Sequence, residues 1–206
     1  PAYLQTLQGG ASLAQNIQDG ILTRGSFLYD EVRFVLQQEL REPRNYFAIL
    51  EAIAAGKTRL SEIKQATGID GATAYLDTLQ QLQLVERRVP ATETQPHKSR
   101  RGIYRLKDHY LRFWFRYVHP HRSQLELGGA QIILDNQVLP QLDLFTGMAF
   151  EEVCRQFLWS WGLSDGLPFA PVNIGNWWNA NEEIDLLVLG DADAMLVECK
   201  WGSKPV

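Results

Sequence analysis

The pattern of apolar residues in the first forty positions is helical. Apolar side chains recur every three or four residues from Leu13 to Leu22 and again from Val32 to Leu40, on either side of a break at Gly25-Ser26. This spacing predicts helices rather than strands. We therefore expect residues 1–41 to form a helical segment, and Pro43 to mark the boundary that follows it.

A second pattern covers residues 42–107. Helical periodicity predicts three helices over 46–55, 61–66 and 71–82, with Ser61 and Asp70 as N-caps of the second and third, and Gly68 ending the second. Two runs typical of strands, 84–89 and 102–106, flank a polar loop at 90–101. Three short helices followed by a hairpin predict a winged helix-turn-helix.

The remaining residues predict a connector over 108–140 and a further domain over 141–206. The aromatic run 111–118 in the connector is interpreted as packing between elements, with base stacking as the alternative. Beyond it, the pattern predicts a helix over 146–159 and strands over 172–178, 183–189 and 194–201. The predicted class is therefore α+β with several domains, ending in an α/β sandwich that lacks its later elements.

Composition restricts the class of protein. Of 206 residues, 45% are hydrophobic and 21% are charged, which is typical of a globular domain. Neither a membrane-spanning stretch nor a leader is present, so we expect a cytoplasmic protein without a membrane partner. Cys154 and Cys199 lack a zinc-binding spacing and are expected to stay reduced. Because the chain begins at Pro1, we expect it to be part of a longer polypeptide.

Charge is distributed unevenly along the chain. Nine of the 20 Lys and Arg residues lie between Arg87 and Arg116, whereas residues 123–199 contain twelve acids and a single basic residue, Arg155. The first region attracts phosphate groups and the second repels them.

The basic region predicts contacts with DNA. Basic wings bind the phosphate backbone, and polar side chains of the third helix of a helix-turn-helix enter the major groove. Winged helices are also protein-binding modules, and Asp77 on the same helix opposes DNA binding, so both alternatives stand. The predicted DNA-binding residues are Thr73, Gln80, Arg87, Arg88, Lys98, Arg100 and Arg101.

The last two predicted strands contain a candidate metal site. A turn at 190–193 sets Leu189 opposite Ala194, and the same register sets Asp185 opposite Glu198. Facing carboxylates repel, so the pair favours a cation such as Mg²⁺ between them. Lys200, on the same face as Glu198, could then stabilise developing charge. The alternative is that these residues are solvated charges on an open strand face.

Several stretches together resemble a known family. They are Pro1-Ala2-Tyr3-Leu4, residues 39–47, residues 104–116, Phe150-Glu151 and Glu198-Cys199-Lys200-Trp201. These stretches resemble the C-terminal half of archaeal-type P-loop ATPases of the AAA+/STAND class. In that family an ATPase module precedes a winged helix and a domain of unknown function that is similar to PD-(D/E)XK restriction-endonuclease-like folds.

The resemblance has specific implications for this chain. Residues 1–41 correspond to a remnant of the ATPase lid, and ATP would be bound by a domain upstream of Pro1. The catalytic and metal-binding acids would be Glu151, Asp185 and Glu198, with Lys200 as a further catalytic residue.

Two functions follow. The first is a DNA-binding effector region, docked through its winged helix, that hydrolyses phosphodiesters with Mg²⁺. The alternative is a catalytically inactive regulatory or protein-interaction module, with the upstream ATPase domain as its partner.

Overall fold

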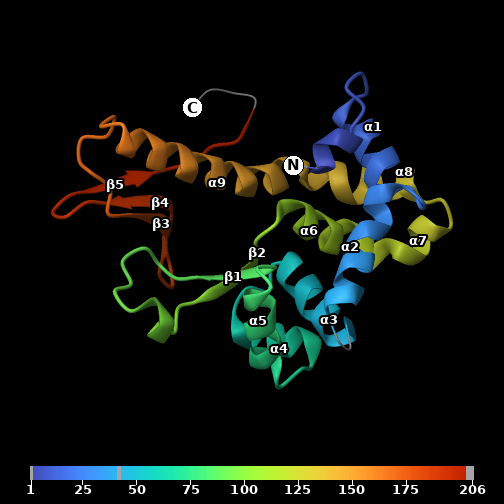
Figure 1. Ribbon diagram of the computed structural model, residues 1–206, viewed down its shortest axis with the longest axis horizontal. Helices are drawn as coiled ribbons and strands as arrows, with labels where there is room; N and C mark the ends of the chain where they lie inside the picture. Colours follow the sequence, from blue (N-terminus) through green and yellow to red (C-terminus); the bar gives the residue numbers. More distant parts are fainter. Residues whose placement is uncertain (1, 41–42, 203–206) are drawn as a thin grey trace. The chain divides into compact units, whose positions relative to one another are not determined.

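The computed structural model describes residues 2–40 and 43–202 as a mixed α+β chain with helices and two small sheets (Figure 1). It divides into two compact units. The first contains residues 1–87 and 103–140, and the second contains residues 88–102 and 141–206. The resemblance places a lid remnant at residues 1–41, of which 1 and 41 lie outside the described residues.

The first unit is mainly helical. Its N-terminal elements are a 3-10 turn (Ala2–Thr6), α1 (Leu13–Ile17) with a π turn (Gln18–Leu22), α2 (Phe27–Glu39), α3 (Pro43–Ala54), α4 (Leu60–Thr67) and α5 (Ala72–Gln81). The strands β1 (Val85–Arg88) and β2 (Ile103–Leu106) form a two-stranded sheet. The later elements are α6 (His109–Phe113) with a π turn (Trp114–Val118), a 3-10 turn (His119–His121), α7 (Arg122–Glu126), α8 (Ala130–Ile133) with a π turn (Leu134–Val138), and a 3-10 turn (Leu139–Gln141).

The aromatic run of the connector is part of the core of this unit. Trp114 and Phe115 are almost completely buried, and the indole nitrogen of Trp114 donates to the carbonyl of Tyr29 at 2.8 Å. Phe47 on α3 packs edge-on against both rings. Packing is thus confirmed as the role of this run, because buried rings cannot stack on bases.

The predicted helix caps were partly wrong. The αL conformation of Gly68, with φ of 68°, does end α4. However, α4 begins one residue earlier than expected, so Arg59 rather than Ser61 is its N-cap, and Glu62 accepts from the backbone nitrogens of Thr58 and Arg59. Gly71 rather than Asp70 precedes α5. The side chain of Glu62 thus provides acceptors for backbone amides at the start of the helix, a role that a serine cap was expected to have.

The second unit consists of one long helix, a three-stranded antiparallel sheet and the loop 88–102. The helix α9 (Leu142–Leu163) packs on the sheet of β3 (Asn173–Trp178), β4 (Glu183–Leu189) and β5 (Ala194–Val197), in the order β3-β4-β5 (Figure 1). Alternate residues of each strand face the helix because side chains alternate across a sheet. The buried core residues are Leu158, Leu167, Ile174, Leu186 and Val188.

The register of the β4–β5 hairpin agrees with the sequence prediction. Leu189 pairs with Ala194, and the backbone nitrogen of Gly190 donates to the carbonyl of Asp193 across the turn. The pairing ends at Leu186 and Val197, so β5 is shorter than the predicted strand 194–201. Asp185, the residue before Leu186, and Glu198, the residue after Val197, lie just beyond this last pair.

The loop 88–102 is attached to the edge of this sheet. The backbone nitrogen of Ala91 donates to the carbonyl of Asn176 at 2.9 Å, and the side-chain amide of Asn173 donates to the carbonyl of Ala91 at 2.8 Å. A Cβ on Gly175 would lie 3.4 Å from that of Ala91. The loop that the sequence predicts to be the wing therefore packs on β3.

Candidate functional site

Asp185 is bonded to the segment that carries Glu198 and Lys200. Its Oδ2 accepts a hydrogen bond of 2.7 Å from the backbone nitrogen of Cys199. In an extended hairpin this amide would pair with a backbone carbonyl, but here a carboxylate takes its place at the point where β5 ends. The bond therefore fixes an acid beside the two residues that flank Cys199 in the chain.

Glu198 and Lys200 form an ion pair on the surface. Their side chains contact each other and are 60% and 57% exposed. The hydrogen bond to Glu198 and its charge raise the pKa of Lys200. Both groups are accessible to a ligand, and an exposed pair of this kind contributes little to stability.

An aromatic contact anchors the chain after Lys200. The ring centroid of Trp201 lies 5.5 Å from that of Phe150 on α9. Gly147 also lies close to Trp201, because a Cβ atom added at Gly147 would be 3.8 Å from the Cβ of Trp201. Contacts at Cys199 and Trp201 therefore hold Lys200 from both sides.

Asn176 joins α9, β4 and the loop 88–102. It is only 5% exposed, and its side-chain nitrogen donates to the carbonyl of Asp185 at 2.7 Å and lies 3.5 Å from Oε2 of Glu151. Its side-chain oxygen accepts from Nη1 of Arg88 at 3.2 Å. A buried amide must have its hydrogen bonds satisfied, so this residue fixes the positions of its partners.

Glu152 neutralises one of the predicted DNA-binding arginines. It contacts the guanidinium of Arg155, accepts from Gln156 and lies 3.3 Å from Nη2 of Arg88. The hydrogen bond from Arg155, aided by Gln156 and the charge of Arg88, lowers the pKa of Glu152 to about 2. Arg88 therefore faces a permanently charged carboxylate at neutral pH.

The two cysteines are half-buried and pack against the core of the second unit. Burial, followed by the neighbouring Cys154 thiol and the charges of Asp185 and Glu151, raises the pKa of Cys199 to about 12.

The three predicted acids are not assembled equally. Glu151 and Asp185 are linked through Asn176, and Asp185 also bonds Cys199, whereas Glu198 extends to Lys200. Within residues 2–40 and 43–202 there is no group of three His, Cys, Asp or Glu side chains positioned to hold a metal ion. Mg²⁺ needs only one or two carboxylates, since water and phosphate oxygens complete its shell.

The predicted DNA-binding residues differ in their surroundings. Lys98 and Arg100 are exposed near the tip of the loop 88–102. Arg101 is bound to Glu93 and donates to the carbonyl of Trp178 at 3.3 Å, and Arg88 is bound to Glu152 and Asn176. In the first unit, Thr73 is exposed on α5, Gln80 donates to the carbonyl of Leu76, and Arg87 is half-buried on β1.

Sequence reasoning missed three residues that organise this region. Asn176, Glu152 and Glu93 hold the arginines and acids in place, yet none was singled out. One signal was available for Asn176, because it lies on the same strand face as Ile174 and Trp178, where an amide is expected to be buried and bonded.

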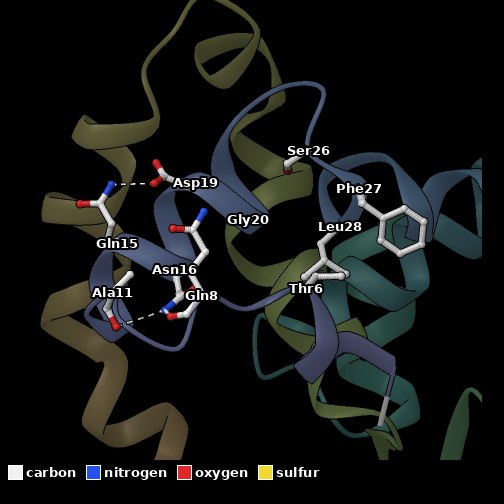
Figure 2. A pocket seen from close by; sticks show the side chains of 10 residues that line it. All are labelled: Thr6, Gln8, Ala11, Gln15, Asn16, Asp19, Gly20, Ser26, Phe27 and Leu28. Carbon is white, nitrogen blue, oxygen red and sulfur yellow. Dashed lines mark hydrogen bonds between the residues drawn. The ribbon is translucent and has the colours of Figure 1, made fainter.

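A separate cavity of about 220 Å³ lies in the first unit beside α1 (Figure 2). Several of its polar side chains are bonded within the wall. Gln15 donates to Asp19 at 2.7 Å, and Asn16 donates to the carbonyl of Ala11 at 3.3 Å. The Oγ of Ser26, which also lines the cavity, is buried and has no hydrogen-bond partner among the described groups.

Comparison with known proteins places the C-terminal region among proteins of unknown function. Residues 114–205 match DUF234, a family described as archaeal and bacterial proteins of unknown function, and this range contains Glu151, Asp185, Glu198 and Lys200. The chain is 40% identical over 180 residues, or 85% of its length, to an uncharacterized protein of Methanocaldococcus jannaschii. It spans 40% of the length of that relative. No solved structure matches the chain.

No helix in the described ranges has both the length and the apolar character needed to span a membrane.

Proposed function

We propose that this chain is the C-terminal effector region of a P-loop ATPase, and that its second unit hydrolyses phosphodiester bonds with Mg²⁺. The hydrogen bond between the Asp185 carboxylate and the amide of Cys199 is the observation that carries this proposal. It brings an acid next to the Glu198-x-Lys200 segment, as the resemblance to PD-(D/E)XK folds implies.

The acids of the site have separate roles in this proposal. Asp185 uses Oδ2 for the bond to Cys199, and Oδ1 has no hydrogen-bond donor among the described groups, so it is free to bind a cation. Glu198 would provide the second carboxylate when its contact with Lys200 opens, and Glu151 would support the ion through water. A divalent ion supplies charge stabilisation and an activated water in such sites.

Lys200 would stabilise the negative charge that develops on phosphate. Like any exposed lysine it is a cation at neutral pH, and its position is accessible to a nucleic acid. The excess of acids in this unit opposes the approach of DNA, so the exposed cations Lys98 and Arg100 are needed to attract it.

Binding of Mn²⁺ to the 206-residue chain tests the proposal, together with nicking of supercoiled plasmid in the same buffer. We expect Glu198→Ala and Asp185→Asn to abolish both signals, while Glu183→Ala, which removes an exposed acid from β4, leaves them unchanged. Retention of Mn²⁺ binding in both site variants would rule out the assigned ligands.

A second candidate function is a non-enzymatic module that docks DNA or a protein under control of an upstream ATPase domain. The internal pairing of Arg88 with Glu152, and of Glu198 with Lys200, favours it, because these charges are already satisfied within the protein. Mn²⁺-independent binding of DNA by wild-type protein, without any cleavage, would identify this function. ATP would be bound outside these 206 residues in either case.

A further inference from the structure

We propose that the first unit contains a binding pocket for a small phosphate-bearing ligand, separate from the acids of the second unit. The pocket has a volume of about 400 Å³, within the range of small-ligand sites. Its walls come from α2, α3 and the segment that joins the 3-10 turn His119–His121 to α7. The ionisable lining residues are Arg33, Arg44, Glu51, His119 and Arg122.

Three guanidinium groups from separate elements meet at this pocket. Arg33 lies on α2, Arg44 on α3, and Arg122 at the start of α7. Arg33 and Arg122 line the same pocket as His119, and the charges of both lower the pKa of its imidazole. Like charges repel, so their convergence is unfavourable until an anion binds between them.

The pocket arginines are incompletely neutralised by the protein. Arg122 pairs with Glu126 at 3.0 Å, whereas neither Arg33 nor Arg44 forms an ion pair with any residue in the described part of the chain. Glu51 is the one acid among the described residues of the lining, and its Oε2 lies 3.5 Å from Nε2 of His119. Guanidinium groups in this arrangement match phosphate oxygens, which they bind in a bidentate manner.

His119 adds a neutral polar group to the wall. Burial, followed by the charges of Arg122 and Arg33, lowers its pKa. Its Nδ1 is buried and has no hydrogen-bond partner among the described protein groups. This nitrogen is enclosed by the protein, so the arginines rather than Nδ1 of His119 would provide the hydrogen bonds to a ligand.

The apolar part of the wall is rigid. Phe47 lines the pocket and packs against Trp114, Phe115 and His119, with ring centroids 5.4 to 6.3 Å apart. The ring of His119 also stacks on Trp114. A fixed aromatic wall beside unpaired arginines favours a compact ligand with a charged end over a long flexible chain, since a preformed site loses less entropy on binding.

Calorimetric titration of the 206-residue chain with inorganic pyrophosphate at constant ionic strength tests the pocket. We expect saturable binding, and a dissociation constant at least about tenfold higher in the Arg33→Gln/Arg44→Gln variant, because two charge-assisted hydrogen bonds to the ligand are removed. The control Arg24→Gln removes an exposed arginine of the same unit outside the pocket and should bind as the wild type does. Circular dichroism and thermal unfolding without ligand establish that each variant is folded.

Three results would overturn the proposal. One is the absence of binding by wild-type protein at millimolar pyrophosphate. Another is an equally weakened affinity in Arg24→Gln, which would reveal attraction by general surface charge. The third is that the wild-type protein does not bind pyrophosphate but binds a short DNA duplex, and that this DNA binding requires Arg33 and Arg44. That result would assign these arginines to nucleic acid.

Discussion

The carboxylate of Asp185 accepts a hydrogen bond of 2.7 Å from the backbone nitrogen of Cys199, at the position where the hydrogen-bond ladder between β4 and β5 would otherwise continue. A side chain thus ends the strand pairing, and the chain that carries Glu198 and Lys200 leaves the sheet at a defined place. The same carboxylate is a predicted metal ligand, so structural and chemical roles meet in one residue.

Substitution of Asp185 separates these two roles. Asp185→Asn keeps an oxygen that can accept from Cys199, so we expect a nearly unchanged urea midpoint and loss of Mn²⁺ binding. Asp185→Ala leaves the amide without its partner and should cost about 1–3 kcal/mol of unfolding free energy. Equal stability of the two variants would show that the bond to Cys199 contributes nothing.

Removal of the Asn176 side chain is expected to destabilise the second unit. Asn176→Ala leaves the carbonyl of Asp185 and one nitrogen of Arg88 without their bonds, at a cost of about 1–3 kcal/mol or more. Asn181→Ala, an exposed substitution in the loop before β4, serves as the control. Urea unfolding followed by tryptophan fluorescence measures both.

The effect of Glu152→Gln should depend on pH. The folded-state pKa of Glu152 is about 2, below its ordinary value of 4.5, so its charge stabilises the folded protein above pH 4.5 and this contribution is lost as the pH falls toward 2. We expect the variant to be less stable than wild type at pH 7 and the difference to shrink toward pH 3. Asp191→Asn, in the β4–β5 turn, is the control variant. A stability difference between Glu152→Gln and wild type that does not change with pH would contradict the assigned pKa.

The basic residues of the loop 88–102 should divide into two groups. Lys98→Gln and Arg100→Gln are expected to leave stability unchanged and to weaken DNA binding, with the slope of log affinity against log salt falling by about 0.9 for each phosphate that is no longer neutralised. Arg88→Gln should lower the unfolding temperature, because it removes one of the two arginines that contact Glu152 and the donor to the side-chain oxygen of Asn176. Gel shifts at several salt concentrations and thermal unfolding distinguish the groups.

Cys199 should react slowly with alkylating reagents in the folded protein. With a pKa of about 12, its thiol is protonated at pH 8, and the thiolate is the nucleophile. Cys154→Ala removes a neighbouring thiol that raises the pKa of Cys199 and should speed iodoacetamide labelling of Cys199, as mass spectrometry would detect. Rapid labelling of wild type at pH 8 would refute this assignment.

Local patterns in the sequence were sufficient for most of the secondary structure. Apolar periodicity located α3, α4, α5 and α9 to within a few residues, because a helix that buries one face repeats its pattern every turn. The turn at 190–193 set the register of the β4–β5 hairpin, since strand residues alternate with a period of two. The end of β5 was missed because a side chain, not a turn, ends the pairing.

The sequence by itself determined which residues could provide chemistry: the acids at 151, 185 and 198, the lysine at 200 and the basic stretch from 87 to 116. Only the tertiary structure decided which of these charges remain available. Arg88 meets Asn176 across 88 residues of chain and Glu152 across 64, and Arg101 meets Trp178 across 77. Such contacts leave no periodic trace in the sequence, because they depend on how α9, the sheet and the loop 88–102 pack together.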